Sequence, residues 1–351
     1  MTRTKCGATR PLASFLSLIV VLAITLPATL SGAVSPPVLK LDRGWRVQSS
    51  AKVSAEGPNI SSPGFRTEGW YDATVPSTVL AVQVANGEFP DPNFGMNLRR
   101  LPGMTYPIGL NSFNRFPMSK DSPYAVPWWY RTEFRLPLEY KGKSVWLHLQ
   151  GINNRANLWL NGHKLADKKD IAGAYRIYEF NVTAYAEPGK TNVLAAEVFA
   201  PTPDDLAVNW VDWNPTPPDK NMGLWGDASL SVSGPVSVRY PAVMTHFADN
   251  SLKQAELTVR AELQNAADHP VDGVLEAAFD DIHLNRRFNC SQTRRSPPRL
   301  PQSNTRSCES RIRKSGGQRE WERLLCIGSP CVSSWTASPQ MKAPYASASA
   351  R

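Results

Sequence analysis

The sequence predicts an all-β fold that consists of a sandwich or jelly roll over residues 36–235 and part of an immunoglobulin-like sandwich over residues 236–284. Three observations lead to this prediction. Between Leu39 and Leu284 hardly any segment has helical periodicity, and short runs of alternating apolar and polar residues recur instead. Clusters of Gly, Pro, Asn or Asp bound each run, as they do in sandwiches.

The N-terminal end has the pattern of a secretory signal peptide. Three basic residues and no acid precede an apolar run from Phe15 to Leu26, and Ser31-Gly32-Ala33 supplies the small residues that a signal peptidase requires. The run is shorter than the roughly 20 residues of a membrane-spanning helix. We therefore expect cleavage after Ala33, a secreted or periplasmic location, and no membrane association once residues 1–33 are removed.

The strands of the first sandwich are expected where β-branched and aromatic residues alternate with polar ones. Asn161-Gly162 marks a tight hairpin turn, because both of its positions need positive φ. The tryptophans within these runs are expected in the core rather than on a ligand-binding surface. The expected strands are Val38–Val47, Trp129–Leu136, Ser144–Leu149, Ala156–Leu160, Arg176–Val182, Asn192–Phe199 and Ala228–Val232, and the tryptophans are Trp70, Trp128, Trp129, Trp146 and Trp159.

A second sandwich is predicted to begin near Pro235. Two short strands lead to a cleanly alternating one, a turn follows, and a further strand ends before the pattern stops around Ile282–Leu284. The expected elements are strands at Val236–Tyr240, Ala242–Phe247, Ala255–Leu263 and Gly273–Phe279, with a turn at Asn265–His269.

The formal net charge of +9, from 39 Lys plus Arg against 30 Asp plus Glu, would suggest a nucleic acid or an anionic membrane as partner. The positive charge is confined to the two ends, with +3 in residues 1–35 and +10 in residues 285–351. Residues 36–284 carry −4. The body of the chain is therefore mildly acidic, and we expect no nucleic-acid partner.

Residues 285–351 are interpreted as a disordered basic tail. They are rich in Arg, Ser and Pro, and they hold Cys290, Cys308, Cys326 and Cys331, whereas residues 36–289 contain no cysteine. These cysteines have neither the paired short spacing nor the histidines of a zinc site, so no metal or cofactor is expected. One interpretation is a tail that binds nucleic acid or acidic lipid. The interpretation we favour is a frameshift within the second sandwich.

Several motifs, in order, resemble glycoside hydrolase family 2 and, within it, its exo-β-D-glucosaminidase-like group. The last of them, of the form DWNP.PPD.NMG.W, favours this group over the β-galactosidases. Together they cover about residues 37–284 and include Gly69–Leu80, Gly87–Asn97, Trp128–Phe134, Gln150–Gly162 and Asp212–Trp225.

The resemblance implies a jelly-roll sugar-binding domain, an immunoglobulin-like domain and a (β/α)₈ barrel that carries two catalytic carboxylates. A barrel needs about 250 residues of alternating strand and helix, and no such pattern follows residue 284. We therefore assign no catalytic residue, and we expect the chain alone to be inactive. A displaced reading of Lys314–Leu324 is compatible with the WWP..MG.P segment of the family, which is expected at this place.

The resemblance also implies a carbohydrate partner of the β-linked glucosamine or chitosan type. In the family the Pro-rich loop reaches toward the barrel mouth, so Asp212, Trp213 and Asn214 are the predicted substrate-binding residues. Trp213 would stack on a sugar face, and Asp212 would accept hydrogen bonds from hydroxyl or ammonium groups. Packing at a domain interface is the alternative role of these residues. A stand-alone carbohydrate-binding module and a non-functional truncated product are the alternative functions.

Overall fold

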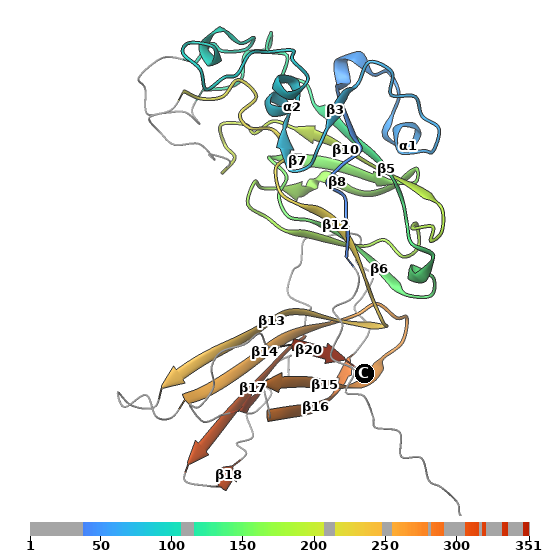
Figure 1. Cartoon of the computed structure of the whole chain (residues 1–351), viewed down its shortest axis with the longest axis vertical. Helices are drawn as coiled ribbons and strands as arrows, with labels where there is room; N and C mark the ends of the chain where they lie inside the picture. The colour runs from blue at the N-terminus through green and yellow to red at the C-terminus, as the bar shows by residue number, and fades with distance from the viewer. Residues whose placement is uncertain are drawn as a thin grey trace, which may run out of the picture. The chain divides into compact units, whose positions relative to one another are not determined.

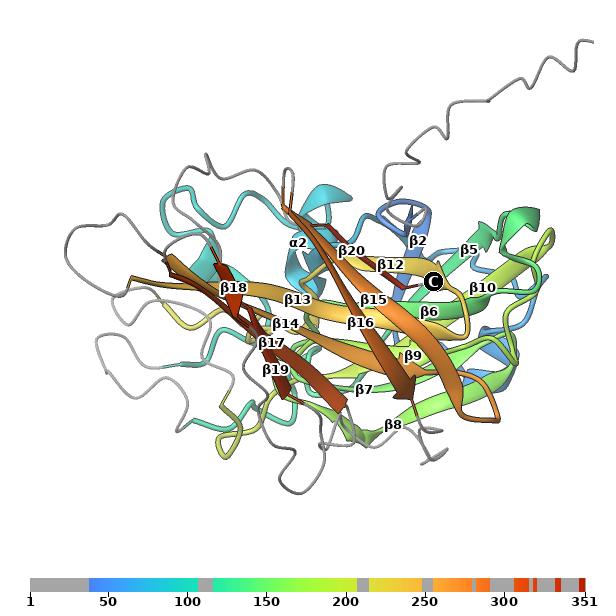
Figure 2. The same ribbon diagram turned by 90° about the horizontal axis from the view of Figure 1, so that it is seen from below.

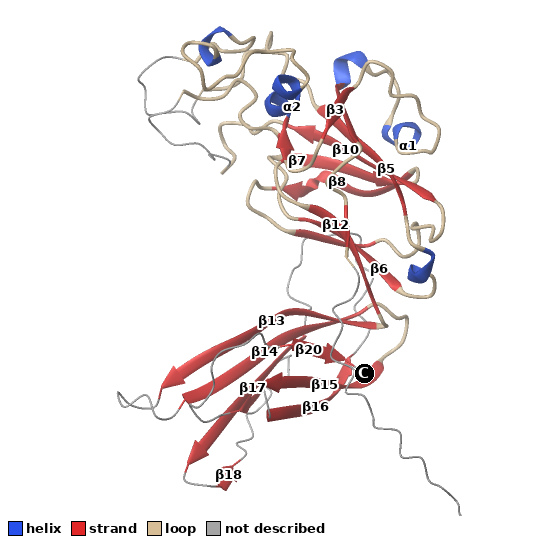
Figure 3. Ribbon diagram, viewed as in Figure 1, coloured by secondary structure: helices blue, strands red, loops and turns tan. Residues whose placement is uncertain are grey.

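The computed structural model describes residues 38–106, 116–206, 215–247, 255–279 and 282–290, together with short strands between residues 306 and 350. Strands predominate, and the few short helices lie in connections between residues 50 and 140 (Figure 3). The predicted all-β fold is confirmed. Among the described residues, no helix has the length and apolar character needed to cross a bilayer.

Two antiparallel sheets form the layers of the first sandwich (Figure 1). The six-stranded sheet has the order β3 (Tyr71–Ala73), β2 (Trp45–Ser49), β5 (Trp128–Arg135), β10 (Thr191–Phe199), β7 (Arg155–Leu160), β8 (His163–Ala172). The four-stranded sheet has the order β1 (Leu39–Lys40), β12 (Ala228–Ser233), β6 (Ser144–Leu149), β9 (Tyr178–Asn181). A short pair, β4 (Ser77–Thr78) and β11 (Gly223–Leu224), leads into helix α2 (Val79–Ala85).

The predicted hairpin turn is confirmed between β7 and β8. Asn161 has φ +50° and Gly162 has φ +82°, and Leu160 pairs with His163 across the turn. Asn161 also ties the turn to the neighbouring strand, because its Oδ1 accepts a hydrogen bond from the Val193 amide at 2.8 Å.

The core of the first sandwich is large and aromatic. Trp45 and Tyr130 have no exposed surface and meet edge to face, with ring centroids 6.5 Å apart. The predicted burial of the strand tryptophans is confirmed: Trp128, Trp129, Trp146 and Trp159 are at most 7% exposed, and Trp70 packs against the cluster around Trp129.

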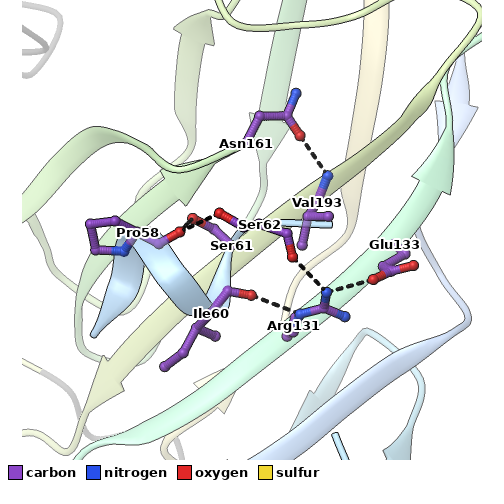
Figure 4. Close-up of polar contacts among 8 residues, drawn as sticks. All are labelled: Pro58, Ile60, Ser61, Ser62, Arg131, Glu133, Asn161 and Val193. Carbon is purple, nitrogen blue, oxygen red and sulfur yellow. Dashed lines mark hydrogen bonds and ion pairs between the residues drawn. The ribbon is translucent and has the colours of Figure 1, made fainter. Parts of the chain in front are cut away.

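A buried arginine fastens helix α1 (Gly57–Ile60) to the six-stranded sheet (Figure 4). Arg131 on β5 donates from Nε to the Ile60 carbonyl at 2.7 Å and from a terminal nitrogen to the Ser62 carbonyl at 3.2 Å, and it pairs with Glu133. The carbonyl groups at a helix C-terminus lack intrahelical partners, so this guanidinium satisfies them within the fold.

The second region also has two layers (Figure 2). One sheet has the order β13 (Val236–Phe247), β14 (Ala255–Asn265), β17 (Arg306–Ser315), β18 (Gln318–Glu320), with β19 (Val332–Trp335) beside β17. The other has the order β16 (Ile282–Cys290), β15 (Val271–Phe279), β20 (Ser347–Ala350). The two strands expected at Val236–Tyr240 and Ala242–Phe247 are one strand with an irregularity after Arg239.

Strands are also described beyond residue 284. β16 continues to Cys290 and pairs with β15 along its length, and β17 adds to the edge of β14. Unpaired amide and carbonyl groups at a sheet edge favour the addition of such strands, whatever their composition. Cys290, which had no role in the sequence interpretation, is buried beside Leu263 and Leu275.

Candidate functional site

The predicted residues Asp212, Trp213 and Asn214 lie outside the described part of the chain. The structure resumes at Pro215 and describes the rest of the same motif, through Trp225. These residues form the base of the predicted sugar-facing loop, so their contacts decide how that loop is held.

Asp219 anchors this base to helix α2. The carboxylate is fully buried; its Oδ2 accepts a hydrogen bond from the Leu80 amide and its Oδ1 one from the Asn221 amide, both at 2.9 Å. Leu80 is in the first turn of α2, and Thr78 caps that helix by accepting from the Ala81 amide. Free amide groups and the helix dipole make a helix start a favourable place for a carboxylate.

Burial changes the pKa of the Asp219 carboxylate and the pKa values of nearby tyrosines. Burial raises the pKa of Asp219 to about 6, although its hydrogen bonds to the amides of Leu80 and Asn221 act in the opposite direction. Burial, together with the nearby Asp219 carboxylate, raises the pKa of Tyr106 to about 12. The same causes raise the pKa of Tyr124 and Tyr130.

Lys220 and Asn221 turn the chain through the left-handed region, with φ +49° and +55°. The Lys220 side chain is buried, and its Nζ donates to the Phe116 carbonyl at 2.7 Å. The ammonium also lies 5.6 Å from the centre of the Tyr106 ring. A cation at this distance from an aromatic face is attracted by it.

Asn153 supports the same turn from the opposite side. Its Nδ2 donates to the carbonyls of Lys220 and Asn221 at 2.9 and 2.8 Å, and its backbone exchanges two hydrogen bonds with Gly223. A Cβ at Gly223 would lie 2.5 Å from the Ser77 carbonyl oxygen, so only glycine permits this approach. The PPD.NMG part of the motif is thus a tightly fixed structural unit.

A cavity of about 690 Å³ opens beside this unit. Its walls come from helix α2, from the loop after residue 90 and from the segment after residue 214. The polar lining includes Asp91, Asn93 and Arg99 together with Asn221, and the apolar lining includes Pro215, Pro217, Leu80 and Val84. A volume of this size with a few polar groups fits a small ligand, such as one or two sugar rings.

The loop that carries Asp91 is held by its own side chains. Asp91 Oδ1 accepts from the Asn93 amide at 2.9 Å, and Asn97 Nδ2 donates to the Asp91 carbonyl at 2.9 Å. The sequence interpretation used these residues as part of a family motif and assigned them no site. The motif was the available signal, since the cavity forms where this loop and α2 meet residues 215–221, which are more than 100 positions away in the sequence.

The polar groups that line the cavity can form hydrogen bonds with a ligand. Carboxylate and amide oxygens accept hydrogen bonds from hydroxyl or ammonium groups, and guanidinium and amide nitrogens donate to hydroxyl or ring oxygens. Within the described ranges, no group of three His, Cys, Asp or Glu side chains is placed to hold a metal ion.

Part of the first sandwich matches a known family of domains. A family profile described as glycosyl hydrolase 2 galactose-binding domain-like matches residues 122–208. An exo-beta-D-glucosaminidase of Amycolatopsis orientalis is 34% identical over 223 residues, which are 63% of this chain and 19% of the relative. One of Streptomyces avermitilis is 32% identical over 244 residues, which are 69% of this chain and 25% of the relative.

Solved structures agree with these relatives. The crystal structure of the Amycolatopsis orientalis exo-chitosanase matches with a TM-score of 0.63 and 28% identity, over 79% of this chain and 28% of that one. A complex of a variant of that enzyme with PNP-beta-D-glucosamine matches with a TM-score of 0.64. The resemblance predicted from the sequence is confirmed. This chain spans about a fifth to a quarter of the length of these curated relatives.

Proposed function

We propose that this chain, whose residues 122–208 match the galactose-binding domain-like profile of glycosyl hydrolase 2, is the sugar-facing N-terminal part of a secreted glycosidase that acts on β-linked glucosamine. The identity to exo-beta-D-glucosaminidases over 63–69% of the chain supports this substrate class. The observation that carries the proposal is the fixed base of the predicted sugar loop, with Asp219 hydrogen-bonded to the start of α2 beside a cavity of about 690 Å³.

In this proposal the first sandwich recognises sugar and leaves hydrolysis to a barrel. Trp213 stacks on a pyranose face, and Asp212 accepts hydrogen bonds from the ammonium group of glucosamine. Pro215 and Pro217, in the cavity wall, stiffen the chain that leads back to Asp219. The net charge of −4 over residues 36–284 suits a cationic polymer.

Retaining hydrolysis needs two carboxylates about 5–5.5 Å apart, one as acid/base and one as nucleophile. We assign neither role to a residue of this chain. Purified residues 34–351 should therefore release no p-nitrophenol from PNP-beta-D-glucosamine. Release of p-nitrophenol would overturn the accessory role.

Affinity electrophoresis through gels that contain glycol chitosan tests the binding. We expect the wild-type chain to be retarded, and Trp213→Ala and Asp212→Asn to lose most of the retardation. Tyr175→Ala is the matched control, because Tyr175 is an exposed aromatic residue that does not line the cavity. No retardation of the wild type, or equal retardation of Trp213→Ala, would contradict the proposal.

A stand-alone carbohydrate-binding module is a second candidate, because the described cavity is lined by residues 78–99 and 215–221, all within the first sandwich. Binding of the wild-type chain to glycol chitosan is expected for both candidates. They differ in whether the chain forms a complex with a catalytic barrel and increases its activity. If a relative's barrel, supplied as a separate chain, forms no complex with this one and gains no activity from it, the stand-alone module is favoured.

Secretion and a displaced reading frame belong to the same proposal. Export is supported by the basic, apolar and small-residue pattern of residues 1–33, and N-terminal sequencing of exported protein should begin at Val34. The coding DNA beyond Leu284 should continue the second sandwich and then a barrel in another frame. A DNA sequence without such a continuation would exclude the frameshift.

A further inference from the structure

We propose that Lys220 is a positioning residue, whose buried ammonium joins Tyr106 and Phe116 to the wall of the sugar-binding cavity. This inference rests on the proposed function for its effect on sugar recognition. Its effect on the positions of Tyr106 and Phe116 is independent of that function.

The first observation is where the charge lies. Lys220 is 1% exposed, although lysine is one of the residues that are least often buried in folded proteins. The Nζ donates to the Phe116 carbonyl at 2.7 Å and lies over the Tyr106 ring at 5.6 Å. The two residues therefore meet at one ammonium group, although ten positions separate them in the sequence.

The second observation is the backbone of Lys220 itself. Its φ of +49° lies in the left-handed region, which glycine and asparagine adopt more readily than a long side chain does. The position nevertheless carries a lysine, whose amide donates to the Pro217 carbonyl and whose carbonyl accepts from Asn153 Nδ2, both at 2.9 Å. The conformation thus aims a long cationic side chain at Phe116.

The third observation is what Lys220 is attached to. Asp219, the preceding residue, is hydrogen-bonded to the start of α2, and Asn221, the next residue, lines the cavity. Burial lowers the pKa of Lys220, which fits an ammonium removed from water. The Lys220 side chain therefore couples the position of the cavity wall to the positions of Tyr106 and Phe116.

Lys220→Met tests this role, because methionine fills a similar volume and removes the ammonium. Hydrogen exchange of the amides at residues 104–106, 116 and 118 should rise about tenfold, the scale of a lost charged hydrogen bond. Retardation by glycol chitosan should fall. Lys190→Met is the matched control, since Lys190 is an exposed lysine that pairs with Glu187.

Unchanged exchange at 104–106, 116 and 118 in Lys220→Met, relative to Lys190→Met, would overturn the positioning role. Faster exchange with unchanged retardation would overturn the link to sugar recognition. If Lys220→Met does not fold, Tyr106→Leu removes the aromatic contact alone, and it should raise exchange at residues 116 and 118. If the wild type is not retarded, the proposed function fails while the exchange experiment still decides the role of Lys220.

Discussion

Among the residues whose side chains are described, the two sandwiches differ in the size of their cores. In the first, a continuous cluster fills the space between the sheets and includes aromatic side chains with no exposed surface, such as Trp45 and Tyr130. In the second, the described core consists of Val236, Ala261, Leu263, Leu275 and Cys290. Since burial of apolar surface is the main stabilising term, the first region should unfold at a higher denaturant concentration than the second.

Exposed apolar and buried charged side chains occur in both regions. On β13 of the second sandwich, Tyr240, Val243, Met244 and Phe247 are 38–54% exposed, and in the first sandwich Phe94 and Leu206 are 75% and 91% exposed. Asp219 and Lys220 are buried with partners in the first region, and Arg239 is buried beside Glu179 in the second. The two regions therefore differ in the size of their described cores and not in the character of their surfaces.

A matched pair of core truncations should show the contrast most strongly. Leu158→Ala in the first core is expected to lower the free energy of unfolding by about 4 kcal/mol, and Leu263→Ala by about 2 kcal/mol. The second value is smaller because we expect the surroundings of Leu263 to relax further into the space that the substitution leaves. Urea unfolding followed by tryptophan fluorescence mainly checks the first value, since nine of the 11 tryptophans lie within residues 36–235. Circular dichroism follows both regions. Equal costs would remove the distinction.

The buried carboxylate of Asp219 should have the next largest effect on stability, and this effect should depend on pH. The pKa of Asp219 is about 6 in the fold against an ordinary 3.8, so the fold favours the protonated form. This stabilisation, about 3 kcal/mol, is complete below pH 3.8 and is lost as pH rises through about 6.

Asp219→Asn should abolish this pH-dependent contribution. Its stability should change less than that of the wild type between pH 4 and pH 7, because the amide does not titrate. Parallel pH profiles for the two proteins would show that Asp219 is not the group responsible.

The contact between the start of β13 and the first sandwich should have a smaller effect. Arg239 pairs with Glu179 and lies 4.4 Å from the centre of the Trp146 ring. Glu179 keeps some exposure, so the loss in Arg239→Met should be about 2 kcal/mol, below the value for a fully buried pair. A double-mutant cycle with Glu179→Gln measures the coupling, and a value below about 0.5 kcal/mol would contradict this role.

The pH dependence of this contact has the opposite sign to that of Asp219. Burial acts to raise the pKa of Glu179, but the hydrogen bond to His148 and the charge of Arg239 together lower it below 4.5. The stabilisation is therefore present above pH 4.5 and is lost as pH falls through the lowered value. Arg239→Met should weaken this acid dependence.

The exposed ion pair Arg46–Asp72 should have the smallest effect on the free energy of unfolding. The two side chains are 41% and 77% exposed, and exposed pairs contribute little. Arg46→Ala should change the unfolding free energy by less than about 0.5 kcal/mol. A larger loss would mean that surface charges, and not core size, set the stability of the first region.

The sequence was sufficient for the all-β class, the Asn161–Gly162 turn and the burial of the tryptophans, because period-two alternation and turn chemistry are local signals. It was not sufficient for the anchor. Asp219 and Leu80 are separated by 139 positions, and nothing local marks Asp219 as a buried residue at a helix start. The burial of Cys290 was missed for the same reason, because its neighbours come from β14 and β15.

Hydrogen exchange with and without a fully deacetylated glucosamine oligosaccharide shows which region binds the sugar. We expect protection in peptides that cover residues 78–99 and 212–222, and no change in residues 236–290. Protection within residues 236–290, or none in the first sandwich, would contradict the assignment of sugar binding to the first region.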